Sequence, residues 1–507
     1  MLTLGNELGG DEGVMKSMCD HFRKLDGRHL YAMGSGHFHW DIGLRAGDEF
    51  WITRATGKGL PMRGASFEVK CHIDHQPPST TVDYSASLQG VPVPVIGHEM
   101  AEFEMYPDYR EIKKYTGVLQ ANNFGIFRER LRAAGMLDQA MDFFKASGAL
   151  SVICHREDVE ANLRTPGVGG FHLLDLQDFS GQGTALVGIL DVFMDSKGLI
   201  TPEAWREFCG ETVPLLWMRK YIWTNDEDFR GRVRVAHYGP LDLQGQTVTW
   251  TLCAGRKTVA QGETCAVDIP TGTLTEIDLI HAPLRSISKA TKLVLTLSLK
   301  GTAYRNRYDL WVYPAKTGVT PPKGITVAHA FSRQVEKDLE QGGTVVLIPA
   351  PGTVKQTVTM AFQTGFWSPM FRMGGRKGPD GREVPGTQGI LCDPKHPLFE
   401  DFPTEFHSNW QWWQLVKHSD PVILDDTDSS YRPILQVIDG IDRNHKLGLI
   451  FEARVGKGRL LVCAIDLPGL QAHPEARQLL ACLYRYAGST DFNPLHVLSA
   501  ETIKAMM

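Results

Sequence analysis

The sequence predicts a multidomain protein with an α/β domain first, a β domain next and a second α/β domain last. Its length of 507 residues corresponds to about three domains at roughly 100–200 residues each. Short apolar runs alternate with helical stretches over residues 1–200 and again after residue 325, whereas residues 229–313 are a series of strand-like runs. The composition, 42% hydrophobic and 22% charged, is that of a folded globular chain rather than a disordered one.

Charge and cysteine usage exclude several classes of partner. The net charge is −5 and no long basic run is present, so we expect neither a nucleic-acid nor a membrane partner. No apolar run of about 18 residues and no secretory signal pattern is found. The nine cysteines include no CxxC pair, which predicts buried thiols and neither a structural metal nor a cofactor.

The first domain is expected over residues 1–225. A strand ends near Glu7, and Val14, Met18, Phe22 and Leu25 recur at helical spacing behind an acidic start. Thr201-Pro202 predicts the start of a helix that runs into Trp217 and closes the domain. The remaining predicted elements are strands at His29–Met33, Val82–Ser85, Val93–His98 and Phe171–Leu176, a helix at Tyr109–Tyr115 and a long helical region over 126–163.

The second and third domains are separated by a linker. Residues 226–316 read as a small antiparallel sandwich, because alternating strand runs are divided by Gly and Pro turns. Residues 317–324 are rich in Pro and Gly, which is typical of a linker. In residues 325–507, strands and helices alternate as in a doubly wound sheet. The predicted elements are Arg232–Tyr238, Val248–Cys253, Leu293–Leu299 and Tyr308–Val312 in the sandwich, and Ile325–Ala328, a helix at 331–340, Thr344–Ile348, Leu460–Ile465 and a helix at Pro474–Tyr486 in the last domain.

Two glutamates follow predicted strands. Glu7 ends the run Leu4-Gly5-Asn6-Glu7, and Glu99 ends the run Pro94–Glu99, with room between them for two further βα units. Parallel strands would bring both carboxylates to the same carboxyl-terminal edge of a sheet. Cleavage of a glycosidic bond needs such a pair, and their separation decides between retention and inversion. Solvated or ion-paired glutamates are the alternative, and Glu102 and Glu104 are alternative carboxylates.

The runs at 4–7, 94–99 and 169–179 resemble the C-terminal half of the catalytic barrel of glycoside hydrolase family 2. This family includes β-galactosidases and β-glucuronidases. The resemblance implies that Glu7 is the acid/base and Glu99 the nucleophile of a retaining exo-β-glycosidase, and that Asn6 contacts the sugar 2-hydroxyl, with His98 as a further substrate contact. The substrate would be a β-galactoside or β-uronide carbohydrate. Leu174 stands where the family often carries a sugar-stacking tryptophan, which puts the usual specificity in doubt.

The resemblance also extends to the architecture. It implies strands 4–8 of a (β/α)8 TIM barrel over residues 1–225, an immunoglobulin-like sandwich, and a flavodoxin-like domain of the class I glutamine amidotransferase type. No cysteine lies on a strand-to-helix elbow, so we expect the last domain to be catalytically silent. Only six residues precede Glu7, which predicts an N-terminally truncated fragment lacking about 100 barrel residues. The resemblance further suggests a periplasmic or secreted protein, and a homo-oligomer formed through the C-terminal domain.

Three more residues are candidate substrate contacts. His37 lies in a His-x-His loop that could hold a sugar hydroxyl or a metal, or simply pack. Tyr84 follows a predicted strand and could hydrogen-bond the nucleophile, or be structural. Asp178 lies beyond the last predicted strand and could hold a hydroxyl. Two other functions stay open: a non-catalytic carbohydrate-binding or scaffold remnant, and cysteine-dependent amidase chemistry in the last domain.

Overall fold

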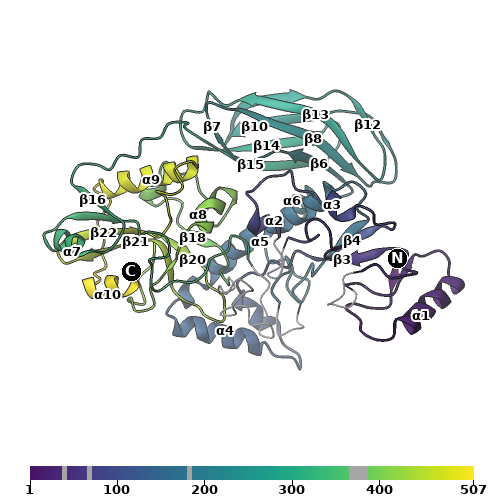
Figure 1. Cartoon of the computed structure of the whole chain (residues 1–507), viewed down its shortest axis with the longest axis horizontal. Coiled ribbons are helices and arrows are strands. Elements are labelled where there is room, and N and C mark those ends of the chain that lie inside the picture. The colour runs from purple at the N-terminus through teal and green to yellow at the C-terminus, as the bar shows by residue number, and fades with distance from the viewer. Residues whose placement is uncertain (37–42, 65–70, 180–184, 365–385) are drawn as a thin grey trace.

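The computed structural model describes residues 1–36, 43–64, 71–179, 185–364 and 386–507 (Figure 1). It confirms a mixed α/β protein with several separate sheets, and no sheet among the described residues closes into a barrel. None of the described helices combines the length and the apolar character needed to cross a bilayer.

The N-terminal part contains five short parallel strands that follow one another in chain order. One sheet pairs the first two strands, and a second sheet holds the other three. Isolated parallel bridges from Ser35 to Asn6 and to Ile52 connect the two sheets. The carboxyl ends of all five strands therefore meet at one edge. The strands are β1 (Leu2–Thr3), β2 (Tyr31–Ala32), β3 (Trp51–Thr53), β4 (Val95–Met100) and β5 (Gly170–Leu173).

Helix α1 (Glu12–Leu25) forms where predicted, but its predicted apolar stripe is exposed. The side chain of Asp11 accepts a hydrogen bond from the amide of Val14 at 2.9 Å and so caps the first turn. Met15 and Cys19, on another side of the helix, are buried in a cluster with Tyr31 and Met33. The stripe itself is between 43% and 69% exposed; its members are Val14, Met18, Phe22 and Leu25.

Two predicted elements are wrong. Residues 82–85 are not a strand: the side chain of Asp83 accepts from the amide of Ser85 at 2.9 Å, and the chain turns into α3 (Ser85–Leu88). The third parallel strand is β3, three residues long and too short to show a period in the sequence. The helix that starts at Pro202 ends at Arg206, and Thr212–Trp217 forms strand β6, because Gly210 interrupts the helix before an apolar run.

Helix α5 (Ala140–Leu163) contacts all three parts of the chain, and in Figure 1 it runs through the centre of the molecule. It packs against β4 and β5 and against β18 (Ile390–Cys392) of the C-terminal part. Toward the β-rich middle part, Arg156 donates to the Asn306 side chain at 2.5 Å, and Glu160 accepts from the Tyr308 hydroxyl at 3.0 Å. The shorter helical elements of the N-terminal part, besides α3, are α2 (His72–His75), η1 (Tyr109–Lys114), α4 (Asn122–Ala133), η2 (Leu137–Gln139) and α6 (Pro202–Arg206).

The β-rich middle part has two main sheets and one small one. Their strand orders are β11-β10-β14-β15-β7, β13-β8-β6 and β12-β9, and all their pairs except β15–β7 are antiparallel. Strands β6 and β7 lie before residue 226. The strands are β6 (Thr212–Trp217), β7 (Ile222–Thr224), β8 (Asp228–His237), β9 (Leu243–Gln246), β10 (Val248–Ala254), β11 (Lys257–Glu263), β12 (Val267–Ile269), β13 (Thr273–Pro283), β14 (Thr291–Leu299) and β15 (Arg305–Tyr313).

The C-terminal part is one mixed sheet with helices around it. The strand order is β16-β17-β22-β21-β20-β18, with β19 beside β21; β16, β17 and β22 run parallel and the other pairs are antiparallel. The elements are β16 (Ile325–Ala328), α7 (Arg333–Glu340), β17 (Thr344–Leu347), β18, η4 (Pro397–Phe399), η5 (Trp410–Trp412), α8 (Trp413–Lys417), β19 (Val422–Ile423), β20 (Leu435–Val437), β21 (Leu447–Val455), β22 (Gly458–Cys463), α9 (Pro474–Ala487) and α10 (Ala500–Met506).

Candidate active site

Glu7 and Glu99 lie at the edge where the parallel strands end. Glu99 is the penultimate residue of β4, and the amide of Glu7 donates to the carbonyl of Ser35, beyond β2, at 2.8 Å. Both glutamates have left-handed backbone, with φ of 48° and 49°. A non-glycine residue in this region costs on the order of 1–3 kcal/mol, and such residues cluster at functional sites.

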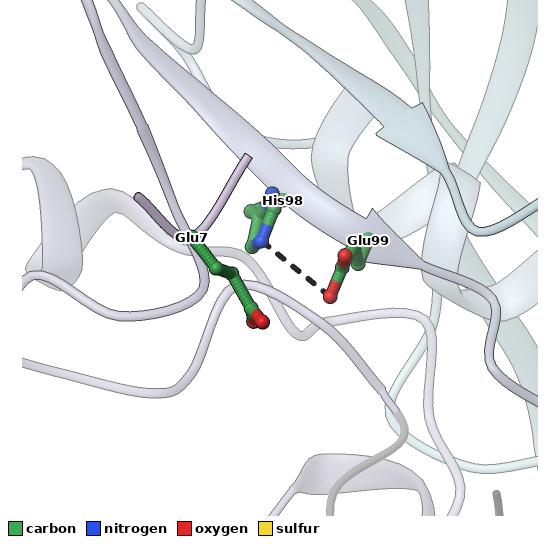
Figure 2. A group of neighbouring side chains, drawn as sticks. All are labelled: Glu7, His98 and Glu99. Carbon is green, nitrogen blue, oxygen red and sulfur yellow. Dashed lines mark ion pairs between the residues drawn. The ribbon is translucent and has the colours of Figure 1, made fainter. Parts of the chain in front are cut away.

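The two carboxylates lie close together. One oxygen of Glu7, one oxygen of Glu99 and one ring nitrogen of His98 all lie within 4.8 Å of one another. Figure 2 shows the Glu7 and Glu99 side chains extending from different segments, with His98 beside them. Glu7 is exposed, whereas the Glu99 side chain is 15% exposed. One carboxylate therefore faces solvent and the other is largely desolvated.

Three side chains hold the Glu99 carboxylate. The Asn6 amide donates to Oε1 at 3.2 Å, Arg63 donates to Oε2 at 3.4 Å, and His98 Nε2 lies 3.4 Å from Oε2. Burial is the largest influence on the pKa of Glu99 and raises it; Arg63 acts in the opposite direction, and the negative charge of Glu7 adds to the increase.

Asn6 and His98 are themselves held by neighbours. The Ser35 hydroxyl donates to Asn6 Oδ1 at 3.0 Å, which leaves the amide nitrogen directed to Glu99. His98 Nδ1 lies 3.2 Å from Nε2 of His172 on β5. The structure thus brings together four residues that the sequence singled out: Asn6, Glu7, His98 and Glu99.

The cluster of Glu7, His98 and Glu99 has the residue types and the spacing that a metal ion could use. The Arg63 guanidinium already contacts Glu99, and a fixed positive charge at this position disfavours a second cation. We therefore interpret the group as a carboxylate pair with Arg63 as a neighbouring positive charge and assign no metal to it.

Three other predicted contacts have different surroundings. Tyr84 is completely buried, and its hydroxyl donates to Asp158 at 3.4 Å rather than to Glu99. Asp178 is buried, forms an ion pair with Lys197 at 2.6 Å and accepts from the amide of Gly188 at 3.0 Å. His37 lies outside the described residues.

The two alternative carboxylates, Glu102 and Glu104, are both buried. Glu102 lies 3.1 Å from Arg63 Nη2, and burial raises its pKa to about 7. Glu104 accepts from the amide of Leu186 at 3.2 Å. Burial of both side chains leaves Glu99 as the carboxylate of this segment that faces Glu7.

Sequence reasoning missed Arg63, Asp158 and His172. Arg63 follows β3, a strand that the sequence pattern did not predict, so its place near the strand ends was not visible. Asp158 is an interior residue of α5 and carries no motif. The one usable signal was at His172, which alternates with Phe171 and Leu173 at the predicted last strand.

Comparisons with known families give matches without a described function. One family model, described as the domain of unknown function DUF8488, matches residues 227–314, and another, DUF8487, matches residues 326–507. No curated protein matches the chain.

Among solved structures, the matches are distant. The exo-chitosanase CsxA of Amycolatopsis orientalis, complexed with PNP-beta-D-glucosamine, has 12% identity and a TM-score of 0.35 over 62% of this chain and 36% of that chain. A beta-glucuronidase of Parabacteroides merdae has 12% identity and a TM-score of 0.16 over 27% of this chain and 21% of that chain. A cycloisomaltooligosaccharide glucanotransferase of Paenibacillus sp. has 10% identity and a TM-score of 0.17 over 27% of this chain and 22% of that chain. The chain spans only about a fifth to a third of these proteins, and such low scores establish neither a shared fold nor a shared function.

Proposed function

We propose that Glu7 and Glu99 are the catalytic carboxylates of a retaining exo-β-glycosidase that hydrolyses β-galactoside-type or β-uronide-type carbohydrates. The observation that carries the proposal is their separation, with one oxygen of each within 4.8 Å of the other. Retaining glycosidases hold the two carboxyl groups about 5–5.5 Å apart, whereas inverting enzymes need about 6.5–9.5 Å to admit a water molecule.

In the first step, Glu7 gives its proton to the glycosidic oxygen while Glu99 attacks the anomeric carbon. The bond to the leaving group breaks, and a glycosyl ester forms on Glu99. In the second step, Glu7 removes a proton from water, the water oxygen attacks the anomeric carbon, and the ester bond to Glu99 breaks. The exposed carboxylate thus exchanges protons with solvent, and the buried one, held by Asn6 and Arg63, acts as the nucleophile. We expect the Asn6 amide, which donates to Glu99 at 3.2 Å, also to contact the sugar 2-hydroxyl.

For the architecture, we propose that β1 to β5 correspond to strands 4–8 of a (β/α)8 barrel within residues 1–225. Residues 226–316 form the immunoglobulin-like module, and residues 325–507 form an amidotransferase-like module without cysteine chemistry. Two of its thiols are buried, with pKa values raised to about 12, which disfavours a thiolate nucleophile; they belong to Cys392 and Cys463. The homo-oligomer and the exported location stay predictions.

The test is to trap the glycosyl intermediate on the full chain with 2,4-dinitrophenyl 2-deoxy-2-fluoro-β-galactoside and the matching glucuronide. Peptide mass spectrometry is expected to find the fluorosugar on Glu99. The variant Glu99→Gln should lose labelling and hydrolysis, while Glu12→Gln, an exposed glutamate of α1, should keep both.

The role of Glu7 is tested separately. Glu7→Ala should still form the intermediate from substrates with activated aryl leaving groups, and azide should speed this variant, because the azide anion attacks the anomeric carbon without a general base and releases Glu99 as a glycosyl azide forms. Saturable oligosaccharide binding without labelling or turnover would overturn the proposal and favour the non-catalytic carbohydrate-binding alternative.

A further inference from the structure

Arg63 lies buried between two carboxylates. Its side chain is 9% exposed, with Nη1 3.4 Å from Glu99 Oε2 and Nη2 3.1 Å from Glu102 Oε2. Nη1 also donates to the backbone carbonyl of Glu99 at 3.4 Å. One guanidinium therefore contacts both the side chain and the backbone of the proposed nucleophile, and it is shared with a second acid.

The segments that carry these residues are joined by Asp158. This side chain on α5 is completely buried and accepts from the amide of Gly64 at 2.7 Å and from the amide of Ala101 at 3.0 Å. Gly64 directly follows Arg63, and Ala101 directly precedes Glu102. A Cβ atom built at Gly64 would come within 2.6 Å of Ile73 Cδ1 and 3.3 Å of the Asp158 carboxyl carbon, so a larger residue here would displace the side chains around Asp158. The backbones bearing Arg63 and Glu102 are thus fixed to one point of α5.

Both Arg63 and Glu102 have further charged or titratable neighbours. Glu102 faces Arg63 and Arg54 as positive groups and Glu99 and Glu7 as negative groups. Arg63 faces Glu102, Glu99, Cys71 and Asp158. Glu102 therefore competes with Glu99 for the same guanidinium only when it is ionised, and its pKa of about 7 confines this competition to neutral and higher pH. A neutral side chain of the same shape at 102 would leave the Arg63 charge to Glu99.

We propose that Arg63 is the positioning residue of Glu99, and that Glu102 is the buried anchor that holds Arg63 in place. This inference rests on the proposed function, because it assigns Arg63 a task in that reaction. Because Arg63 is 9% exposed and its guanidinium contacts Glu99 and Glu102, it acts through Glu99 and not on the sugar.

The test compares variants of Glu102 and Arg63 with the matched variant Glu104→Gln, which also replaces a buried carboxylate of the same segment. The pKa of Glu102, raised to about 7, keeps this acid neutral where Glu99 titrates, so Glu102→Gln, whose amide oxygen can still accept from Arg63, should leave the acid limb of the kcat/KM profile in place. Glu102→Leu removes the acceptor that anchors Arg63 and should lower kcat by about 10-fold. Glu104→Gln should leave the limb in place, because its amide oxygen can still accept from Leu186. Arg63→Met should shift the limb to higher pH and lower kcat by about 10²–10³-fold with little change in KM, and Arg63→Lys should restore part of the loss.

A measurement without turnover separates this inference from the proposed function. Carboxyl ¹³C resonances of glutamate-labelled protein are titrated, and the Glu99 signal is assigned by its absence in Glu99→Gln. A higher Glu99 titration midpoint in Arg63→Met than in wild type supports the inference even if wild type hydrolyses nothing, an outcome that would overturn only the proposed function. An active wild type whose Glu99 midpoint and acid limb are unchanged in folded Arg63→Met would overturn the inference alone. Circular dichroism confirms folding.

Discussion

Replacing Lys197 tests whether Asp178 is a structural residue or a sugar contact. Lys197 Nζ lies 2.6 Å from Asp178 Oδ1, and the two side chains are 5% and 0% exposed. In Lys197→Met, the Asp178 carboxylate keeps the amide of Gly188 as a donor but loses its positive partner. Burial already raises the pKa of Asp178 despite that partner, so an ionised Asp178 without Lys197 is strongly unfavourable.

The expected loss is about 3–5 kcal/mol of unfolding free energy, the magnitude found when one member of a buried pair is removed. The double variant Lys197→Met with Asp178→Asn should recover most of the loss, because the neutral amide can still accept from Gly188. As a control, Asp195→Ala removes a carboxylate that is 66% exposed and paired with Lys114, and it should cost less than about 1 kcal/mol.

The assay is urea denaturation followed by tryptophan fluorescence, combined with steady-state kinetics on an aryl β-glycoside. A Lys197→Met variant as stable as wild type would refute the argument for a buried charge pair. A marked increase in KM for Asp178→Asn without loss of stability would instead make Asp178 a substrate contact.

The other predictions concern pH and packing. Burial raises the pKa of Glu475 from 4.5 to about 7, so the folded state resists ionisation there and loses stability as pH rises from 4.5 to 7. Glu475→Gln should therefore have the same free energy of unfolding as wild type near pH 4.5 and one about 3 kcal/mol higher above pH 7. Thermal melts of both proteins at pH 5 and pH 8 check this, and an equal difference in stability at the two pH values would contradict it. On α1, Met15→Ala should cost about 2–5 kcal/mol, whereas Phe22→Ser should cost less than about 1 kcal/mol because Phe22 is 43% exposed; similar costs in urea denaturation would show that the outer face is packed.

Local sequence signals predicted much of the site. Glu7 and Glu99 were found because each follows a strand-like run, and parallel strands end at one edge. Asn6 and His98 came with them as chain neighbours. Arg63 and Asp158 could not be found in this way, because one follows a three-residue strand and the other is an interior helix residue whose partners lie far away in the chain.

The fold was predictable to a similar degree and for similar reasons. Helix α1 was predicted from the helical spacing of its apolar residues, but this spacing alone cannot distinguish an apolar stripe that packs against the core from one that faces solvent. The surroundings of Asp178 could not be predicted either. Its position after the last predicted strand suggested a contact with a sugar hydroxyl, but its ion-pair partner Lys197 lies in an irregular segment that has no periodic sequence pattern. Strand β6 was read as helix because the Pro202 start signal outweighed Gly210.

Helix α5 links the segments around Glu7 and Glu99 to the β-rich middle part of the chain. Asp158 holds the loops next to the two glutamates, while Arg156 and Glu160, two residues to either side, form hydrogen bonds with the β-rich middle part. A residue inserted between Asp158 and Glu160 would rotate everything after it by about 100° and advance it by about 1.5 Å. The contacts of Asp158 and those of Arg156 and Glu160 therefore depend on the same helical register. An insertion that preserved one set of contacts would break the other.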